Sequence, residues 1–402
     1  MFRRIEARGY RCLRSVELSI NPFEILIGSN ASGKSSFLDV VAFLSTLVSK
    51  GLEAAVEERT TNFHDLVWGR DADSFELADS FELAVEALIP DDRRPMPPIP
   101  PVEFEAPDTI RYEVGIRLDT LTEKLHIAKE RVTIRRSHRA PPDPGIEVVS
   151  RSNVFHLHTE AERRHYEREL YDLHRSYSAL NNVPADAEFP ATAWLRESLR
   201  NRIKRVALDV EVLRKPSPPA TNEADESRGS YLARSVAQLR SPNSGQFKAW
   251  LAHVKTVLPD IQDIRTEVRP DDRHRYIMID YENGVSVPSW MVSDGTLRLL
   301  ALTLLAYVPD FSGVYLVEEP ENGLHPTALQ AVYESLSSVY EVQVLVASHS
   351  PVLLSMAQPD QLLCFIKAPD GTQIIRGSEH RALRDWQGEV TLGMLAASGI
   401  LG

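Results

Sequence analysis

Eight residues near the N-terminus have the types and spacing of a phosphate-binding loop. They are Gly28, Ser29, Asn30, Ala31, Ser32, Gly33, Lys34 and Ser35, and Ser36 follows them. In such a loop, glycines let backbone N–H groups face phosphate oxygens, the lysine reaches the outer phosphates, and the last serine offers a hydroxyl to Mg²⁺. The apolar run Phe23–Ile27 predicts a strand before the loop, and the helical spacing of apolar residues after Gly33 predicts a helix behind it. The sequence therefore predicts a site for a nucleoside triphosphate with Mg²⁺, with ATP as the nucleotide that we expect.

Two acidic residues follow a second apolar run, Val314–Val317. They are Glu318 and Glu319, and Pro320 comes after them. This is a Walker B pattern, in which the first acid holds Mg²⁺ and the second accepts a proton from the attacking water, a role worth about 10²–10⁴ in rate. Taken alone, the residues could equally be a buried strand followed by an acidic turn. Their occurrence together with the phosphate-binding loop favours the catalytic interpretation.

A histidine follows a third apolar run, Val344–Ala347. The run continues as Ser348, His349 and Ser350. At the carboxyl end of a parallel strand, such a side chain faces the crevice in which ligands bind. A lone histidine is usually structural, but the position of His349 after the acidic strand favours contact with the ligand.

A fourth motif opens a predicted helix that runs from Ser293 to about Ala306. It consists of Ser293, Asp294, Gly295 and Thr296. The simplest interpretation is an N-cap, because serine and aspartate satisfy the free N–H groups of a helix start. The same free N–H groups and the positive end of the helix dipole could instead receive a γ-phosphate.

The order of these motifs resembles the ABC-type ATPase heads, which include the SMC, RecF and overcoming-lysogenization-defect (OLD) proteins. The opening segments Ile5–Tyr10 and Leu13–Val16 are similar to the start of RecF and OLD proteins, and Glu321–Pro326 is similar to the D-loop of the OLD type. The resemblance covers roughly residues 1–90 and 240–367. It implies an α/β fold: a P-loop ABC-type ATPase head with a mostly parallel sheet, an antiparallel β subdomain and a helical insertion.

The resemblance also implies a homodimer in which ATP lies between two heads, with higher oligomers left open. Ser293, Asp294, Gly295 and Thr296 would form the signature that acts in trans on the partner's γ-phosphate. Glu319 would be the general base, His349 the γ-phosphate sensor, and Asn322 would lie in the D-loop at the dimer interface. Ser35 and Glu318 would hold the metal.

Two features depart from the family pattern. Glu318 stands where the pattern has aspartate, and no glutamine occurs between the phosphate-binding loop and Gln238, so the Q-loop glutamine is missing. His64, Asp65 or a residue of the duplicated stretch 72–83, which we expect to be extended, could replace it, or a water could. We therefore expect slow hydrolysis.

Length and composition predict a soluble, cytoplasmic protein of several parts. The chain has 402 residues, two cysteines and a net charge of −12. Two distant cysteines indicate reduced thiols, and the longest apolar run, Leu299–Val308, is too short to cross a bilayer. We expect residues 1–150 to form the first part of the head, 151–240 a helical insertion, and 241–402 the rest of the head.

Three functions are compatible with the sequence. The leading hypothesis is an ATPase that dimerises on ATP and regulates a separate effector, such as a Toprim-type nuclease, or DNA, in phage defence or genome maintenance. No acidic cluster of Toprim type follows His349, so we expect any nuclease to be a separate protein. The alternative is a RecF-like DNA-binding repair clamp, supported only by the arginines of residues 163–205, which at helical spacing beside glutamates are more often a solvated face. A transporter subunit is disfavoured by the central insertion, the D-loop and the missing Q-loop.

Overall fold

The computed structural model describes most of the chain in two compact units. The described residues are 1–69, 79–96, 105–137, 145–151, 155–160, 165–166, 176–184, 187–219, 226–240, 245–309, 311–339, 341–384, 391–399 and 401. Unit 1 comprises residues 1–21, 30–203 and 367–374, and unit 2 comprises residues 22–29, 204–366 and 375–402. The chain passes from unit 2 into unit 1 between Ser29 and Asn30, within the phosphate-binding loop.

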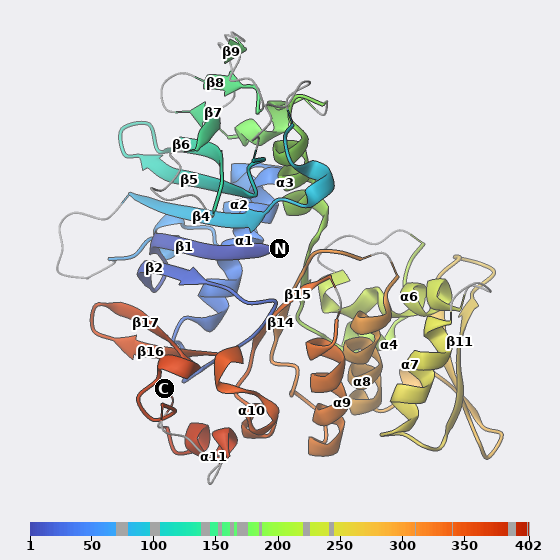
Figure 1. Ribbon diagram of the computed structural model, residues 1–402. Coiled ribbons are helices and arrows are strands. Elements are labelled where there is room, and N and C mark those ends of the chain that lie inside the picture. The colour runs from blue at the N-terminus through green and yellow to red at the C-terminus, as the bar shows by residue number, and fades with distance from the viewer. Residues whose placement is uncertain are drawn as a thin grey trace. The chain divides into compact units, whose positions relative to one another are not determined.

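Unit 1 is built on an eight-stranded antiparallel sheet with the order β2-β1-β4-β5-β6-β7-β8-β9. Its strands are β1 (Phe2–Tyr10), β2 (Leu13–Ser19), β4 (Ser80–Leu88), β5 (Thr109–Asp119), β6 (Lys124–Arg135), β7 (Ile146–Arg151), β8 (Phe155–His158) and β9 (His165–Tyr166). Figure 1 shows these strands, coloured blue to green, following one another across the sheet. The antiparallel β subdomain that the sequence predicts is therefore present, and its sheet includes strands beyond residue 150.

Helix α1 (Lys34–Lys50) is the main helix that packs on this sheet. All its residues from Phe37 to Val48 are buried, because apolar side chains occur on every face of the helix. It ends where Gly51 adopts a φ of 96°. The other helical segments of unit 1 are α2 (Leu52–Glu57), η1 (Phe63–Leu66), η2 (Asp91–Arg93), η3 (Ala179–Asn182) and α3 (Pro190–Asn201).

A second sheet of six strands has the order β10-β14-β15-β3-β16-β17. Its strands are β3 (Phe23–Gly28), β10 (Ile203–Val206), β14 (Val314–Glu318), β15 (Gln343–Ala347), β16 (Leu362–Ala368) and β17 (Gly371–Arg376). The pairs β14–β15, β15–β3 and β3–β16 are parallel. Parallel strands are buried on both faces, which is why β14 and β15 read as continuous apolar runs.

The rest of unit 2 consists of helices and a three-stranded antiparallel sheet. The strands of that sheet are β11 (Ile261–Val268), β12 (Arg275–Tyr281) and β13 (Ser286–Pro288). The helices are α4 (Val210–Arg214), α6 (Leu232–Leu239), α7 (Gln246–Lys255), α8 (Asp294–Leu304), α9 (Pro326–Ser337), α10 (Pro351–Met356) and α11 (Leu392–Ala397), and the shorter turns are η4 (Glu226–Ser230), η5 (Ser289–Met291), η6 (Leu305–Tyr307), η7 (Pro359–Gln361) and η8 (Gly377–Glu379).

The structure differs from the sequence expectation in the segment from Thr159 to Leu213. The sequence predicts a helical insertion over residues 151–240, which includes this segment, but strand β10 lies between α3 and α4. Ile203 and Val206 are buried while the two residues between them are exposed, and β10 lies beside β14 in the sheet. Residues 72–78 of the duplicated stretch, and Arg163, Arg164, Arg168 and Arg175, lie outside the described residues.

Candidate functional site

The phosphate-binding loop leaves the sheet at the end of β3, between the parallel neighbours β15 and β16. Its backbone enters the left-handed region at Gly28 (φ 148°), Ala31 (φ 60°) and Gly33 (φ 105°). A Cβ atom on Gly33 would lie 2.6 Å from Oγ1 of Thr372 and 3.0 Å from Sγ of Cys12. Thr372 also donates a hydrogen bond of 2.9 Å to the carbonyl oxygen of Ser32. Only glycine fits this position, and the loop is held at its base.

Several residues of the loop are exposed, whereas its lysine is buried. Ser29, Asn30, Ala31 and Ser35 are exposed, whereas Lys34 is only 5% exposed. Within the described residues, the buried Oγ of Ser32 has no hydrogen-bond partner. The first turn of α1 contains no acidic residue, so no carboxylate opposes an anion at this helix start. Ser36, which follows the loop, accepts a 3.4 Å hydrogen bond from Sγ of Cys12.

Strand β14 ends at Glu318, and Glu319 follows in a left-handed conformation with a φ of 47°. A left-handed backbone is uncommon for a residue other than glycine and often marks a functional site. Glu319 donates its N–H to the carbonyl oxygen of Ala347 at 2.8 Å, and its Oε2 accepts a 2.6 Å hydrogen bond from Nδ2 of Asn322. The exposed carboxylate is thereby held at a defined place.

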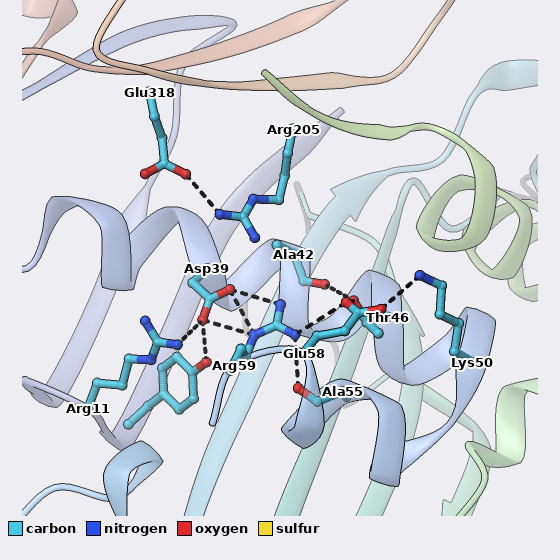
Figure 2. A network of polar contacts seen from close by, with 11 residues as sticks. Arg11, Asp39, Ala42, Thr46, Lys50, Ala55, Glu58, Arg59, Arg205 and Glu318 are labelled. Atoms are coloured by element: carbon cyan, nitrogen blue, oxygen red, sulfur yellow. Dashed lines mark hydrogen bonds and ion pairs between the residues drawn. The ribbon is translucent and has the colours of Figure 1, made fainter. Parts of the chain in front are cut away.

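The carboxylate of Glu318 forms an ion pair with Arg205 of β10. The distance from Nη2 of Arg205 to Oε1 of Glu318 is 3.0 Å, and the Glu318 side chain is 24% exposed (Figure 2). A positively charged side chain therefore lies beside the carboxylate that the sequence assigns to the metal.

His349 is presented by a tightly bonded turn at the end of β15. The buried Ser348 donates its N–H to the carbonyl oxygen of Leu26 at 3.1 Å, and its Oγ accepts the N–H of Ser350 at 3.0 Å. The N–H of His349 donates to Oε1 of Glu321 at 2.6 Å. The His349 side chain is exposed, so the turn leaves the imidazole available to a ligand.

Strand register brings three of these motifs to one sheet edge. Glu318 is the register partner of Ala347, and Ala347 is the register partner of Leu26. The strands β14, β15 and β3 are parallel, so the residues that follow them lie at the same carboxyl edge. The structure thus places Gly28, Glu318 and His349 at neighbouring strand ends, while the roles assigned to them stay predictions.

The predicted signature forms the start of α8. Ser293 caps the helix, since its Oγ accepts the N–H of Thr296 at 3.2 Å and donates to Oγ1 of Thr296 at 2.8 Å. Arg214 forms an ion pair with Asp294 and donates to the carbonyl oxygen of Trp290 at 2.9 Å. The N-cap interpretation is therefore confirmed for Ser293, and the role of this segment as a signature stays a prediction.

A close approach joins the signature to the predicted D-loop. A Cβ on Gly295 would lie 3.0 Å from the carbonyl oxygen of Gly323. Gly323 follows Asn322 and has a φ of 70°. The segment that begins α8 thus lies against the loop after β14, within unit 2.

The replacement for the missing Q-loop glutamine stays open. His64 and Asp65 both lie in η1. Asp65 accepts a 2.8 Å hydrogen bond from Oγ1 of Thr60. Within the described residues, the buried Nδ1 of His64 has no partner.

The sequence reasoning did not single out two residues that contact the predicted site. Arg205 was counted among the arginines of a charged helical segment, and Glu321 was treated only as part of the D-loop. Ile203 and Val206 are buried on either side of the exposed Lys204 and Arg205, a spacing that lacks the period-two alternation of a strand, so the local pattern did not indicate that Arg205 belongs to the sheet.

The described residues contain no group of three or more His, Cys, Asp or Glu side chains that could hold a metal ion by themselves. Among the same residues, no helix has the length and apolar character needed to cross a membrane.

Comparison with known proteins places this sequence in a family. The sequence matches the family described as "AAA domain, putative AbiEii toxin, Type IV TA system" over residues 25–355. No curated protein matches it. An SMC head solved with the C-terminal winged-helix domain of ScpA is similar in structure, with a TM-score of 0.56, 14% identity and coverage of 93% of this chain and 96% of that chain. An SMC head with an extended coiled coil, bound to the C-terminal domain of ScpA and derived from Pyrococcus furiosus, has a TM-score of 0.51, 12% identity and coverage of 93% and 95%.

The family match spans most of the chain, and the structural likeness confirms the predicted fold. The chain belongs to the AAA domain family named above, and its fold is that of an ABC-type ATPase head.

Proposed function

We propose that this protein binds ATP with Mg²⁺ and hydrolyses it slowly, and that two copies pair head to head around the nucleotide. The observation that carries the proposal is the meeting of Gly28, Glu318 and His349 at one edge of a parallel sheet. A family of AAA domains and the fold of an ATPase head support the same activity.

Each motif has a definite task in this proposal. The backbone N–H groups of the phosphate-binding loop and the ammonium of Lys34 bind the phosphates of ATP. Glu319 accepts a proton from the attacking water, and its left-handed backbone with the hydrogen bond from Asn322 fixes its carboxylate. His349 contacts the γ-phosphate from the end of β15.

The hydroxyl of Ser35 and the carboxylate of Glu318 would hold Mg²⁺, which neutralises charge on the phosphate oxygens when it is bound. Glu318 is one methylene longer than the aspartate of the family pattern. That difference, with the missing Q-loop glutamine, is the reason why we propose slow turnover.

The second copy is needed for the signature. Ser293 and Gly295 would contact the γ-phosphate held by the partner, and Asn322 would lie at the interface between the two heads. The contact between Gly295 and the carbonyl of Gly323 supports this, because it couples the signature to the D-loop within one chain. A movement of the signature at the dimer interface would therefore shift the D-loop residue Asn322, and through its hydrogen bond also Glu319.

The output of the ATP-bound dimer would be control of a separate effector, with a Toprim-type nuclease as the candidate, in phage defence or genome maintenance. The family description names a toxin of a toxin–antitoxin system, and the similar SMC heads were solved with a bound protein domain. Both support a head that acts through a partner. Direct DNA binding is less supported, because two arginines from the segment 163–205 have internal partners: Arg196 donates to the carbonyl of Leu180 at 3.3 Å and Arg205 pairs with Glu318.

The test compares Glu319→Gln with the wild-type protein. We expect the variant to lose at least about 10²-fold in ATP turnover, because the carboxamide cannot take the proton. It should still bind ATP and form the dimer, as measured by calorimetry and by light scattering after gel filtration. Glu334→Gln, an exposed residue of α9 that accepts from Gln330 at 2.9 Å, is the matched control and should match the wild type. Unchanged hydrolysis in Glu319→Gln would remove the role that we assign to Glu319.

A further inference from the structure

We propose that Arg205 pairs with the carboxylate of Glu318 in the nucleotide-free protein, in the place that the metal cation would take. Binding of Mg²⁺ and nucleotide then displaces Arg205 from this carboxylate. This inference rests on the proposed function, because it takes Glu318 as a Mg²⁺ ligand. It adds a residue to that site from a strand that carries none of the sequence motifs.

Arg205 and Glu318 contact each other without an intervening residue. Nη2 of Arg205 lies 3.0 Å from Oε1 of Glu318, which is hydrogen-bond distance. The two side chains are 47% and 24% exposed, so water reaches the pair and the two charges can separate without unfolding the sheet. In the described part of the chain, Arg205 is the only ion-pair partner of Glu318.

The local sequence of β10 explains why Arg205 reaches this carboxylate. Ile203 and Val206 are buried and anchor the strand beside β14, which ends at Glu318. Successive side chains of a strand point to opposite faces. Lys204 therefore leaves on the other side, where its Nζ lies 4.5 Å from the ring centroid of Phe311. Of the two adjacent cations, Arg205 is the one that pairs with the metal carboxylate.

Competition follows from the chemistry of the two cations. A guanidinium and Mg²⁺ both seek the oxygens of the same carboxylate, and they repel each other at short range. Binding of the metal to Glu318 must therefore displace Arg205 or strain the pair. The ion pair keeps the carboxylate neutralised before nucleotide arrives, and it raises the Mg²⁺ concentration that the protein needs.

The test measures how much Mg²⁺ is needed for nucleotide binding, without relying on turnover. A fluorescent, non-hydrolysable ATP analogue is bound to the full chain at increasing Mg²⁺ concentrations. In Arg205→Ala and in Arg205→Gln, the half-saturating Mg²⁺ concentration should fall by about 1.5- to 5-fold, the range expected for loss of a solvent-exposed ion pair. Arg205→Lys keeps a cation and should lie closer to the wild type. Arg381→Ala, an exposed arginine elsewhere in unit 2, removes the same charge and should change nothing.

A double-mutant cycle assigns the effect to the pair. In a Glu318→Gln background, Arg205→Ala should no longer shift the Mg²⁺ requirement. An unchanged or raised requirement in Arg205→Ala and Arg205→Gln would overturn the inference and leave the proposed function intact. A shift of the same size in the Glu318→Gln background would also overturn it. A wild-type protein that binds no nucleotide would overturn the proposed function and this inference together.

Discussion

Glu321 accepts a hydrogen bond from the backbone N–H of His349, with 2.6 Å between Oε1 of the glutamate and the nitrogen. Glu321 lies in the loop after β14, and His349 lies in the turn after β15. The other carboxylate oxygen of Glu321 is buried and, within the described residues, has no partner. This single bond connects the loop of the predicted general base to the turn that presents the predicted sensor.

Replacement of Glu321 should therefore disturb catalysis through His349. In Glu321→Ala the N–H of His349 loses its acceptor, and we expect ATP turnover to fall by roughly 10- to 100-fold, the scale of a misplaced catalytic group. Glu321→Gln retains a carbonyl oxygen as acceptor and should keep most of the activity. Turnover and nucleotide affinity measured in parallel should show a loss in rate with little change in affinity. Equal losses in the alanine and glutamine variants would contradict this positioning role.

A buried carboxylate in α1 should control the stability of unit 1. Asp39 is 5% exposed and lies between two arginines: Nη2 of Arg59 is 2.8 Å from its Oδ1, and Nη2 of Arg11 is 3.0 Å from its Oδ2 (Figure 2). Tyr10 donates its hydroxyl to the same group at 2.6 Å. Breaking a buried pair leaves an uncompensated charge, so Arg59→Ala should lower the free energy of unfolding by about 3–5 kcal/mol. Urea denaturation measures this free energy of unfolding. The control is Lys50→Ala, whose ion pair with Glu58 is exposed, and it should lower the free energy of unfolding by less than about 1 kcal/mol.

The same carboxylate should make stability depend on acid pH. Burial raises the pKa of Asp39, but the charges of Arg59 and Arg11 and the hydrogen bonds outweigh burial, and the net shift lowers the pKa. A lowered pKa contributes stability that is present above the unfolded value of about 3.9 and is lost as the pH falls through the folded value. The difference in unfolding free energy between wild type and Asp39→Asn should thus shrink as the pH falls below about 4. A difference that stays constant down to the lowest pH would show that Asp39 is not ionised in the folded protein.

Gly33 should not tolerate a side chain. Its φ of 105° is strained for any other residue, and a Cβ would lie 2.6 Å from Oγ1 of Thr372. Gly33→Ala should cost about 1–3 kcal/mol in unfolding free energy and weaken nucleotide binding, because the loop backbone must move. Gly245→Ala is the control, since no atom of the described residues outside its own helix and its chain neighbours lies within 4 Å of its added Cβ. Wild-type nucleotide affinity in Gly33→Ala would show that the loop conformation seen here is not the one that binds phosphate.

The strands and motifs of the site could be predicted from the sequence because each is formed by a short, continuous stretch of residues. Apolar runs predict β3, β14 and β15, and the residues directly after them predict the phosphate-binding loop, the two acids and the histidine. The boundaries of α1 and α8 follow from Gly33 and Ser293, which are recognisable helix starts.

Contacts between distant segments could not be predicted in this way. Arg205 and Glu318 are brought together only because β10 joins the sheet beside β14, and four residues within a charged segment give a weak strand signal. The same holds for Gly295 against Gly323 and for Thr372 against Gly33, where the packing of the fold decides which atoms meet.

Lys34 gives the most direct test of the central claim that this protein binds ATP with Mg²⁺. Equilibrium binding of a non-hydrolysable ATP analogue should be measured for wild type, for Lys34→Met, which keeps the apolar stem in its buried position, and for the exposed Lys124→Met as control. We expect one nucleotide per wild-type chain, a loss of affinity of at least about tenfold in Lys34→Met, corresponding to about 1.4 kcal/mol, and no loss in the control. Equal affinity in wild type and Lys34→Met, or no binding by the wild-type protein, would contradict the claim.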